Sequence, residues 1–244
     1  MTLRNGDMKD NVVVIIQARM GSSRFPGKMM ADLGGVPLIE WVIRRSKQSG
    51  YKTILATTNK NIDDELVIQA EKLNTDVFRG DENDVLARYH DSATEYHADT
   101  IVRVCADRPL ISAELIQQAV SQYRKSKVDI FFNHISDEDQ TWPRGFGVEV
   151  FSYDFLKRLN KNVKSDFERE HVTLHAWNNR SKHKILADTC LGEYSKHEKD
   201  LKLDVDTHED LERLRNFAYL YDISSTGEHI LKSYAKHTAY LKLT

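Results

Sequence analysis

Three cationic side chains surround a glycine-serine turn near the start of the chain, in the segment A18-R-M-G-S-S-R-F-P-G-K28. Small residues let the backbone approach a ligand closely, and they offer amide and hydroxyl donors. Cations beside such donors predict a loop that holds a polyphosphate, and an unliganded basic surface loop is the alternative. The turn residues, with the alanine before them, are Ala18, Gly21, Ser22 and Ser23, and the cations are Arg19, Arg24 and Lys28.

The spacing in this loop excludes two common phosphate-binding motifs. A P-loop needs Ser or Thr directly after its lysine, whereas Met29 follows Lys28 here. The dinucleotide fingerprint needs three glycines at fixed offsets, which the segment lacks. The loop therefore belongs to another class of phosphate site.

A carboxylate follows a second strand-like run, in the segment A106-D-R-P-L-I111. Carboxylate oxygens are ligands that Mg²⁺ prefers, usually one or two for each ion, with water and phosphate completing the octahedron. Asp107 is therefore a candidate magnesium ligand. A simple turn before a helix that begins near Ser112 is the alternative interpretation.

A second acidic segment, D204-V-D206-T-H-E-D210, also stands between a strand-like run and a helical pattern. Alternation along a strand would place Asp204 and Asp206 on one face. Asp206 is a second candidate metal ligand, and the role of Asp204 stays open. The alternative is a helix N-terminus, with Asp206 or Thr207 as the cap and acidic residues in the first turn.

The elements that would position these residues alternate between strands and helices. This alternation predicts an α/β fold with a mostly parallel sheet and helices on both faces. Ligands of such sheets bind beyond the carboxyl ends of the strands. Strands are expected at residues 12–17, 53–58, 76–79, 100–105, 146–151 and 201–206, and helices at about residues 37–49, 63–73, 84–96 and 207–217.

Composition narrows the class of protein further. The 244 residues suit one large domain over residues 11–244 after a polar tail at 1–10, and the net charge of −2 gives no reason to expect nucleic acid or membrane as a partner. The two cysteines, Cys105 and Cys190, are too few for a disulfide framework and suit a reducing compartment. No long apolar run and no signal peptide are evident, so we expect a cytoplasmic protein.

The loop R19-M-G-S-S-R-F-P-G-K28 resembles the signature loop of the sugar-acid cytidylyltransferases, the CMP-Kdo and CMP-acylneuraminate synthetases, and most closely their spore-coat polysaccharide biosynthesis branch. Similar blocks recur in order to about residue 215, although Arg108 stands where the closest relatives tend to carry cysteine. The resemblance implies a Rossmann-like nucleotide-diphospho-sugar transferase fold and a homodimer. It also implies an Mg²⁺-dependent reaction of CTP with a sugar acid, giving a CMP-sugar and pyrophosphate.

The resemblance also implies roles for individual residues. Arg19 and Lys28 would be catalytic, and Asp107 and Asp206 would hold Mg²⁺. The region of about residues 130–200 would bind the acceptor and form the dimer contact. The expected nucleotide-binding residues are Ala18, Arg19, Gly21, Ser22, Ser23, Arg24, Lys28, Gly80 and Asp84, and the expected acceptor-binding residues are Arg144, Glu149, Arg169, Glu170 and His171.

Other functions share parts of this pattern. Glycosyltransferases of related fold hold a metal with an Asp-x-Asp motif, which D204-V-D206 matches, but their motif lies in the middle of the nucleotide-binding domain rather than late in the chain. A nucleotidyltransferase with another nucleotide or a non-sugar acceptor, and a non-catalytic binding protein, also remain open. The basic loop and both acidic segments together favour the cytidylyltransferase.

Overall fold

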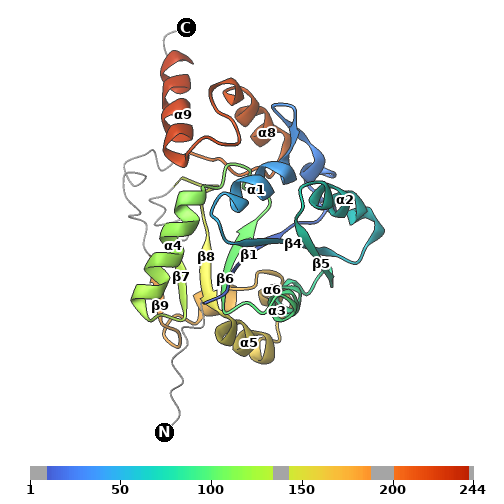
Figure 1. Ribbon diagram of the computed structural model, residues 1–244, viewed down its shortest axis with the longest axis vertical. Coiled ribbons are helices and arrows are strands. Elements are labelled where there is room, and N and C mark those ends of the chain that lie inside the picture. Colours follow the sequence, from blue (N-terminus) through green and yellow to red (C-terminus); the bar gives the residue numbers. More distant parts are fainter. Residues whose placement is uncertain (1–9, 134–142, 188–200, 242–244) are drawn as a thin grey trace.

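A seven-stranded sheet forms the centre of the molecule, in the order β5-β4-β1-β6-β8-β7-β9 (Figure 1). The computed structural model describes residues 10–133, 143–187 and 201–241. All pairings in the sheet are parallel except those of β8, which runs antiparallel to both neighbours. The strands are β1 (Val12–Gln17), β4 (Lys52–Thr58), β5 (Asp76–Gly80), β6 (Thr100–Cys105), β7 (Ile130–Phe132), β8 (Glu149–Ser152) and β9 (Ile185–Ala187).

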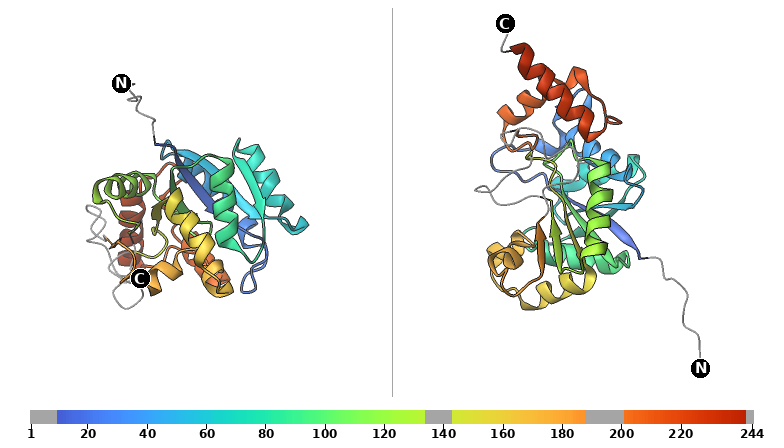
Figure 2. Two further views of the ribbon diagram at one scale, coloured as in Figure 1. Left: turned by 90° about the horizontal axis from the view of Figure 1, so that it is seen from below. Right: turned by 90° about the vertical axis from the view of Figure 1, so that its left-hand side faces the viewer.

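Helices cover both faces of this sheet, as Figures 1 and 2 show. One face carries α1 (Leu38–Lys47), α2 (Asp64–Lys72) and α4 (Ala113–Ser126), with α8 (His208–Arg215) and α9 (Gly227–Leu241) beyond the end of the strands. The other face carries α3 (Val85–Glu95), α5 (Tyr153–Asn162), α6 (Asp166–Glu170) and α7 (Leu174–Asn178). A short hairpin of β2 (Asp32–Leu33) and β3 (Val36–Pro37) precedes α1.

The central strand β1 shows why the sheet forms where it does. Its side chains alternate between two buried clusters: Val14 and Ile16 pack on one face, while Val13 and Ile15 pack on the other. Each of these four side chains is fully buried. β-branched residues suit such a pleated, two-sided environment. The predicted α/β fold, with a mostly parallel sheet and helices on both faces, is confirmed.

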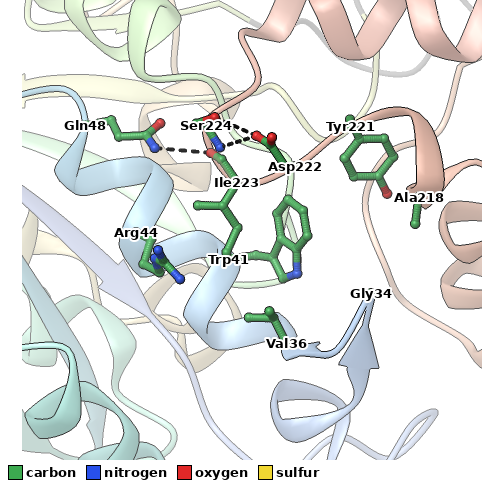
Figure 3. A pocket seen from close by; sticks show the side chains of 10 residues that line it. All are labelled: Gly34, Val36, Trp41, Arg44, Gln48, Ala218, Tyr221, Asp222, Ile223 and Ser224. Carbon is green, nitrogen blue, oxygen red and sulfur yellow. Dashed lines mark hydrogen bonds between the residues drawn. The ribbon is translucent and has the colours of Figure 1, made fainter.

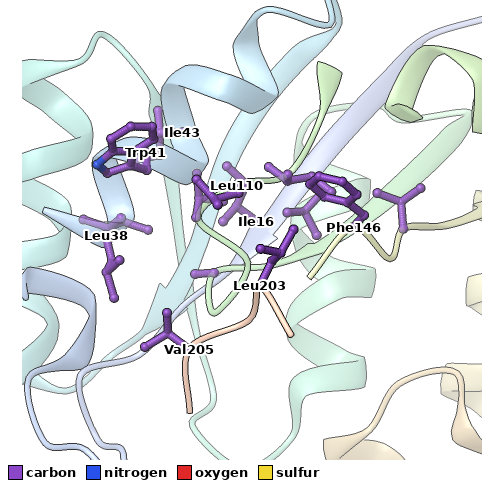
Figure 4. Close-up of a cluster of buried hydrophobic side chains, with 14 of the residues drawn as sticks. Ile16, Leu38, Trp41, Ile43, Leu110, Phe146, Leu203 and Val205 are labelled. Carbon is purple, nitrogen blue, oxygen red and sulfur yellow. The ribbon is translucent and has the colours of Figure 1, made fainter. Parts of the chain in front are cut away.

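The prediction of a final strand at residues 201–206 is wrong. This segment makes only one isolated parallel bridge, between Arg144 and Lys202, and the chain bends at Asp204 and Asp206. The pairing stops because the neighbouring chain turns at Gly145, whose φ is +98°. The predicted alternation is nevertheless present, since Leu203 and Val205 are both buried in the core, with Leu203 near Phe146 (Figure 4).

The strand expected at residues 146–151 is shorter and shifted, because β8 begins only at Glu149 and runs antiparallel to β6. The expected helices at the start of the chain agree with α1, α2 and α3 to within about two residues at their ends. Among the described residues, no helix is long and apolar enough to cross a membrane.

Candidate active site

A polar cleft of about 510 Å³ opens beyond the carboxyl ends of β1 and β6. Four cationic and four acidic side chains line it, together with the small residues of the basic loop. A cleft at this place in a parallel sheet is the usual ligand site of the fold class. The lining residues are Gln17, Ala18, Arg19, Gly21, Ser22, Ser23, Arg24, Lys28, Met29, Glu82, Val85, Arg88, Cys105, Ala106, Asp107, Glu170, His171 and Asp206.

Two sets of buried contacts fix the basic loop that follows β1. The buried Asp63 accepts a 2.7 Å hydrogen bond from the amide of Met20, and it also accepts bonds from Thr57 and Thr58 at the end of β4. Phe25 is buried and its ring lies 3.8 Å from that of His208 at the start of α8. These contacts leave Gly21, Ser23 and Arg24 of the loop exposed at the cleft.

Two cations of the loop lie against one carboxylate. Arg24 Nη2 is 3.1 Å and Lys28 Nζ is 3.7 Å from Asp206 Oδ1. Lys28 is largely buried, and it also donates a 2.7 Å hydrogen bond to the carbonyl oxygen of Val205. The loop and the segment at residues 201–206 are therefore joined directly at the cleft.

Asp107 reaches the same place from the end of β6. Its carbonyl oxygen accepts a 2.8 Å hydrogen bond from the amide of Val205, which places the two acidic segments side by side. Its Oδ1 is buried without a hydrogen-bond partner, and the nearest cation is Arg108, with Nε 3.9 Å away. A buried carboxylate oxygen without a partner is costly, so it marks a position that a ligand would satisfy.

Asp204, whose role the sequence left open, does not line the cleft. It is buried and forms an ion pair with Arg144 at 3.3 Å. Burial raises the pKa of Asp204, Arg144 opposes that shift, and the neighbouring Asp107 adds to it. The expected placement of Asp204 and Asp206 on one face therefore does not give a two-aspartate metal motif, because only Asp206 faces the cleft.

The helix cap at the start of α8 is Thr207, not Asp206. The Thr207 hydroxyl accepts a bond from the amide of Asp210, and the Asp210 carboxylate accepts one from the amide of Thr207, which completes a capping box. The side chain of Asp206 is thus not used for capping. Of the two interpretations of this segment, the cap applies to Thr207 and the cleft position to Asp206.

These residues fit a magnesium site in the number and type of donors they offer. Asp107 and Asp206 both line the cleft, and one or two carboxylates are what Mg²⁺ takes when phosphate oxygens supply other positions. Within the described residues no group of three or more acidic, histidine or cysteine side chains forms a preassembled metal cage. The arrangement therefore suits an ion that arrives with a phosphate ligand.

The opposite wall of the cleft comes from α6 and the turn after it. Glu170 and His171, for which the resemblance implies acceptor binding, line the cleft, and Arg19 Nη2 lies 3.3 Å from Glu170 Oε1. This ion pair joins the basic loop to the opposite wall. The side chains of both partners are more than one-third exposed, so the pair can open at little cost.

Asp84 and Arg169 do not line the cleft. Both residues instead hold neighbouring helices together. Asp84 caps α3 through a bond from the amide of Ala87, and its other oxygen pairs with Arg169 at 2.8 Å. The remaining donors of Arg169 bind the carbonyls of Asn160 and Val163 and the side chain of Asn160. These bonds fix α6 against α3 and α5.

Gly80 does not line the cleft, but it borders Arg88, a cleft residue that the sequence analysis missed. A Cβ atom on Gly80 would lie 3.0 Å from Arg88 Cγ, so the glycine leaves room for that side chain. Arg88 Nη1 donates to the carbonyl of Asp81, its buried Nε has no partner, and burial lowers its pKa. Asp84 and Arg88 are one helical turn apart, but this spacing alone does not show which side chain is buried.

Arg144 and Glu149 are likewise outside the set that lines the cleft. Arg144 pairs with Asp204, and its backbone bonds Leu201 and Leu203. Glu149 is buried under the cleft, where it pairs with Arg103 at 2.7 Å. Glu149 was expected to bind the acceptor, but its carboxylate is paired with Arg103 of β6 and does not line the cleft.

The chain matches the family model described as cytidylyltransferase over residues 13–234. The chain belongs to the cytidylyltransferase family. It is therefore a nucleotidyltransferase, and the predicted relationship to the spore-coat polysaccharide branch and to the CMP-Kdo synthetases is confirmed.

Individual relatives of this cytidylyltransferase agree with the assignment. A cytidylyltransferase structure from Leptospira borgpetersenii has a TM-score of 0.86 and 29% identity, covering 94% of this chain and 95% of that chain. The spore coat polysaccharide biosynthesis protein SpsF of Bacillus subtilis is 28% identical over 84% of this chain and 85% of its own length. A CMP:2-keto-3-deoxy-manno-octonic acid synthetase structure complexed with CTP shares the fold, with a TM-score of 0.61 and 17% identity over 84% of this chain and 96% of that one.

A second cavity of this cytidylyltransferase, about 360 Å³, lies between α1 and the segment that leads to α9 (Figure 3). Trp41, Val36, Tyr221 and Ile223 give it mainly apolar walls. Its polar contacts are internal to the fold, such as the bond from Gln48 to the carbonyl of Ile223. The converging charges of a phosphate site are found in the cleft and not in this cavity.

Proposed function

We propose that this cytidylyltransferase couples CTP to a sugar acid and releases pyrophosphate. The observation that carries the proposal is the convergence of the basic loop, Asp107 and Asp206 in one polar cleft with Glu170 and His171 opposite. The cleft thus has a cationic wall suited to a triphosphate and a separate polar wall suited to an acceptor rich in hydroxyl groups. The names of the relatives support the nucleotide and the acid class.

In the reaction, an acceptor hydroxyl would attack the α-phosphorus of CTP and lose its proton to solvent. The bond between that phosphorus and the oxygen that bridges the α- and β-phosphates would break, so that pyrophosphate leaves. Gly21, Ser22 and Ser23 would contact the phosphates, with Arg24 at the edge of the site. Arg19 and Lys28 would neutralise the negative charge that grows on the α-phosphate and on the leaving pyrophosphate. Catalysis of this kind consists mainly of positioning and electrostatic stabilisation.

Asp107 and Asp206 would hold Mg²⁺ beside the phosphates. A bound divalent cation supplies Lewis-acid stabilisation of phosphate charge. The cleft's own lining offers four cations against four carboxylates, so it has little net positive charge without an ion. Bound Mg²⁺ would offset the negative charge of the two aspartates toward a triphosphate.

The acceptor would lie against Glu170 and His171, whose side chains can hydrogen-bond hydroxyl groups. Arg19 pairs with Glu170 in this structure, so binding of both substrates would separate that pair and turn Arg19 toward the phosphates. Gly80 and Asp84 would act on the nucleotide through the loop that they hold, next to the cleft residues Glu82, Val85 and Arg88.

The Asp-x-Asp glycosyltransferase is disfavoured by the position of Asp204. That aspartate is buried against Arg144 and does not line the cleft, so the motif does not present two carboxylates to one metal. The basic loop would also have no purpose in that reaction.

The proposal extends to the biological setting and the assembly. The similarity to SpsF supports a role in cell-surface polysaccharide biosynthesis. The resemblance to the dimeric sugar-acid synthetases supports a homodimer, with the exposed Phe167 of α6 as a candidate contact residue. Light scattering at micromolar concentration tests this, and a monomer there would contradict it.

A screen of pyrophosphate release tests the proposed reaction. CTP, UTP, GTP and ATP are each paired with a panel of nonulosonic and related sugar acids, with Mg²⁺ present, and the Asp107→Asn variant serves as the inactive control. Release that needs both CTP and a sugar acid supports the proposal. Release with another nucleotide, or with an acceptor that is not an acid, would replace it with the corresponding nucleotidyltransferase.

A further inference from the structure

A strained turn carries the acceptor wall of the cleft. Val172 directly follows His171 and has a φ of +55°, a conformation that is a genuine outlier for a β-branched residue. The amide of Thr173 bonds the carbonyl of His171 at 2.6 Å, which closes a three-residue turn around Val172. Turns of this kind with a positive central φ are rare and strained. Such strain persists only where the surrounding structure fixes it.

Two contacts fix this turn from inside the protein. The side chain of Val172 is fully buried against the face of the sheet that α3 and α5 cover. The hydroxyl of Thr173 donates a 2.6 Å hydrogen bond to Glu149 Oε2, and both residues are buried. Thr173 is the N-cap residue of α7, yet its side chain makes no cap bond. A residue type that normally caps its own helix is used here for a bond to the sheet.

The acceptor of that bond is itself held by a cross-strand ion pair. Arg103 on β6 and Glu149 on β8 are register partners, and their side chains pair at 2.7 Å. The Nε of Arg103 also donates to Gln17 Oε1, and Gln17 lines the cleft. A continuous chain of hydrogen bonds thus runs from the cleft end of β1 through the sheet to the turn beside His171.

We propose that Glu149, held by Arg103, and Thr173 are positioning residues that set the orientation of the acceptor wall at Glu170 and His171. This inference rests on the proposed function, because it assigns the two wall residues to the acceptor. It changes the role of Glu149 from direct contact with substrate to support of the residues that make the contact. The phosphate side of the cleft also has anchors of its own, Asp63 and Phe25, so loss of the Thr173 bond should affect the acceptor far more than CTP.

Replacement of Thr173 tests whether its bond to Glu149 supports binding of the acceptor rather than of CTP. Thr173→Val keeps the shape but removes the donor, and Thr173→Ser keeps the donor as the matched control. We expect Thr173→Val to raise the KM for the sugar acid about tenfold, as for loss of one buried hydrogen bond, and to leave the KM for CTP within about twofold. Thr173→Ser should stay near wild type in both constants. Equal changes in both KM values, or no change in the KM for the acid, would overturn the proposal.

Hydrogen exchange of the amides at residues 171–174 gives a second measurement that needs no acceptor. We expect at least about tenfold faster exchange in Thr173→Val than in Thr173→Ser, because the turn has lost its link to the sheet. Thr173→Ala replaces the valine variant if thermal melting shows that the latter does not fold. If wild-type protein turns over no sugar acid, the proposed function fails, whereas the exchange comparison still decides the positioning role. Unchanged exchange would overturn it.

Discussion

The amide of Val205 donates a 2.8 Å hydrogen bond to the carbonyl oxygen of Asp107. These residues lie far apart in the sequence, and the bond places Asp206 next to the end of β6. A complete parallel strand at residues 201–206 is therefore unnecessary for bringing the two candidate metal ligands to one cleft. The single bond, together with burial of Leu203 and Val205, does so.

Asparagine at either aspartate should abolish most of the Mg²⁺-dependent activity. Asp107→Asn and Asp206→Asn keep size but remove a charge, so each should lower turnover by about 100-fold or more. The double variant should be little worse than the single variants, because residues that hold one ion act as a unit. Steady-state rates across a magnesium titration measure this. Independent, multiplicative losses would contradict a shared site.

The helix cap provides the matched control for that experiment. Thr207→Ala should lower the free energy of unfolding by about 1 kcal/mol, as for loss of an N-cap side chain, while leaving the magnesium titration curve in place. Asp206→Asn should instead keep the free energy of unfolding near wild type and change the magnesium titration curve. If Asp206→Asn loses stability and keeps its magnesium response, the metal assignment of Asp206 is wrong.

Alanine at Arg19 or Lys28 should lower turnover by roughly 10²- to 10³-fold, as for removal of one preorganised donor. The two variants should differ in stability. Lys28 bonds the carbonyl of Val205 and is largely buried, whereas Arg19 makes a partly exposed ion pair. Lys28→Ala should therefore melt at the lower temperature. Near-normal activity of both variants with an identified substrate pair would show that the loop does not bind the phosphates.

An added methyl group at Gly145 should lower the stability of the fold strongly. A Cβ atom there would lie 2.6 Å from the carbonyl carbon of Leu203, in the segment that carries Asp206. Gly50 also has a positive φ but has open space around it, so Gly50→Ala reports conformational strain alone. We expect Gly145→Ala to cost about 2 kcal/mol more than Gly50→Ala, as for overpacking. Urea denaturation measures both, and equal costs would contradict the close approach.

Asp210 should make stability depend on acid pH. Burial opposes ionisation, but hydrogen bonds from Lys202, Arg213 and two backbone amides outweigh it and lower the pKa of Asp210. Because the folded-state pKa lies below the ordinary value of about 3.9, this contribution is complete above that pH and is lost as the pH falls toward the folded-state value. Asp210→Asn should flatten the loss of stability below about pH 4. Glu71→Gln, at an exposed helix site, is the control, and an unchanged slope in Asp210→Asn would contradict the assignment.

At Val172, a glycine variant should be more stable than an alanine variant, which is the reverse of the usual order inside a helix. At Val120, buried within α4, Val→Ala should be more stable than Val→Gly by about 1 kcal/mol. At Val172 the left-handed φ favours glycine, so Val172→Gly should be more stable than Val172→Ala by about 1 kcal/mol. Chemical denaturation of the four variants measures both orders. The same order at both positions would show that the turn is not strained.

The sequence by itself determined the features that depend on neighbours along the chain. Five β-branched residues in a row specify a strand buried on both faces, and the turn of Gly21, Ser22 and Ser23 among cations predicts a phosphate-binding loop. The alternation of strands and helices then required a parallel sheet, whose carboxyl ends bring Asp107 to that loop.

The tertiary structure decided which of several similar side chains face the cleft. Asp204 and Asp206 are equivalent by alternation, but Arg144 pairs with the first and leaves the second at the cleft. Arg169 and Glu170 are adjacent, yet Asp84 binds the arginine and only the glutamate lines the cleft. Glu149 was expected at the acceptor, but Arg103 pairs with it beneath the sheet surface and it does not line the cleft. Each of these pairings joins residues distant in the sequence, so packing alone sets them.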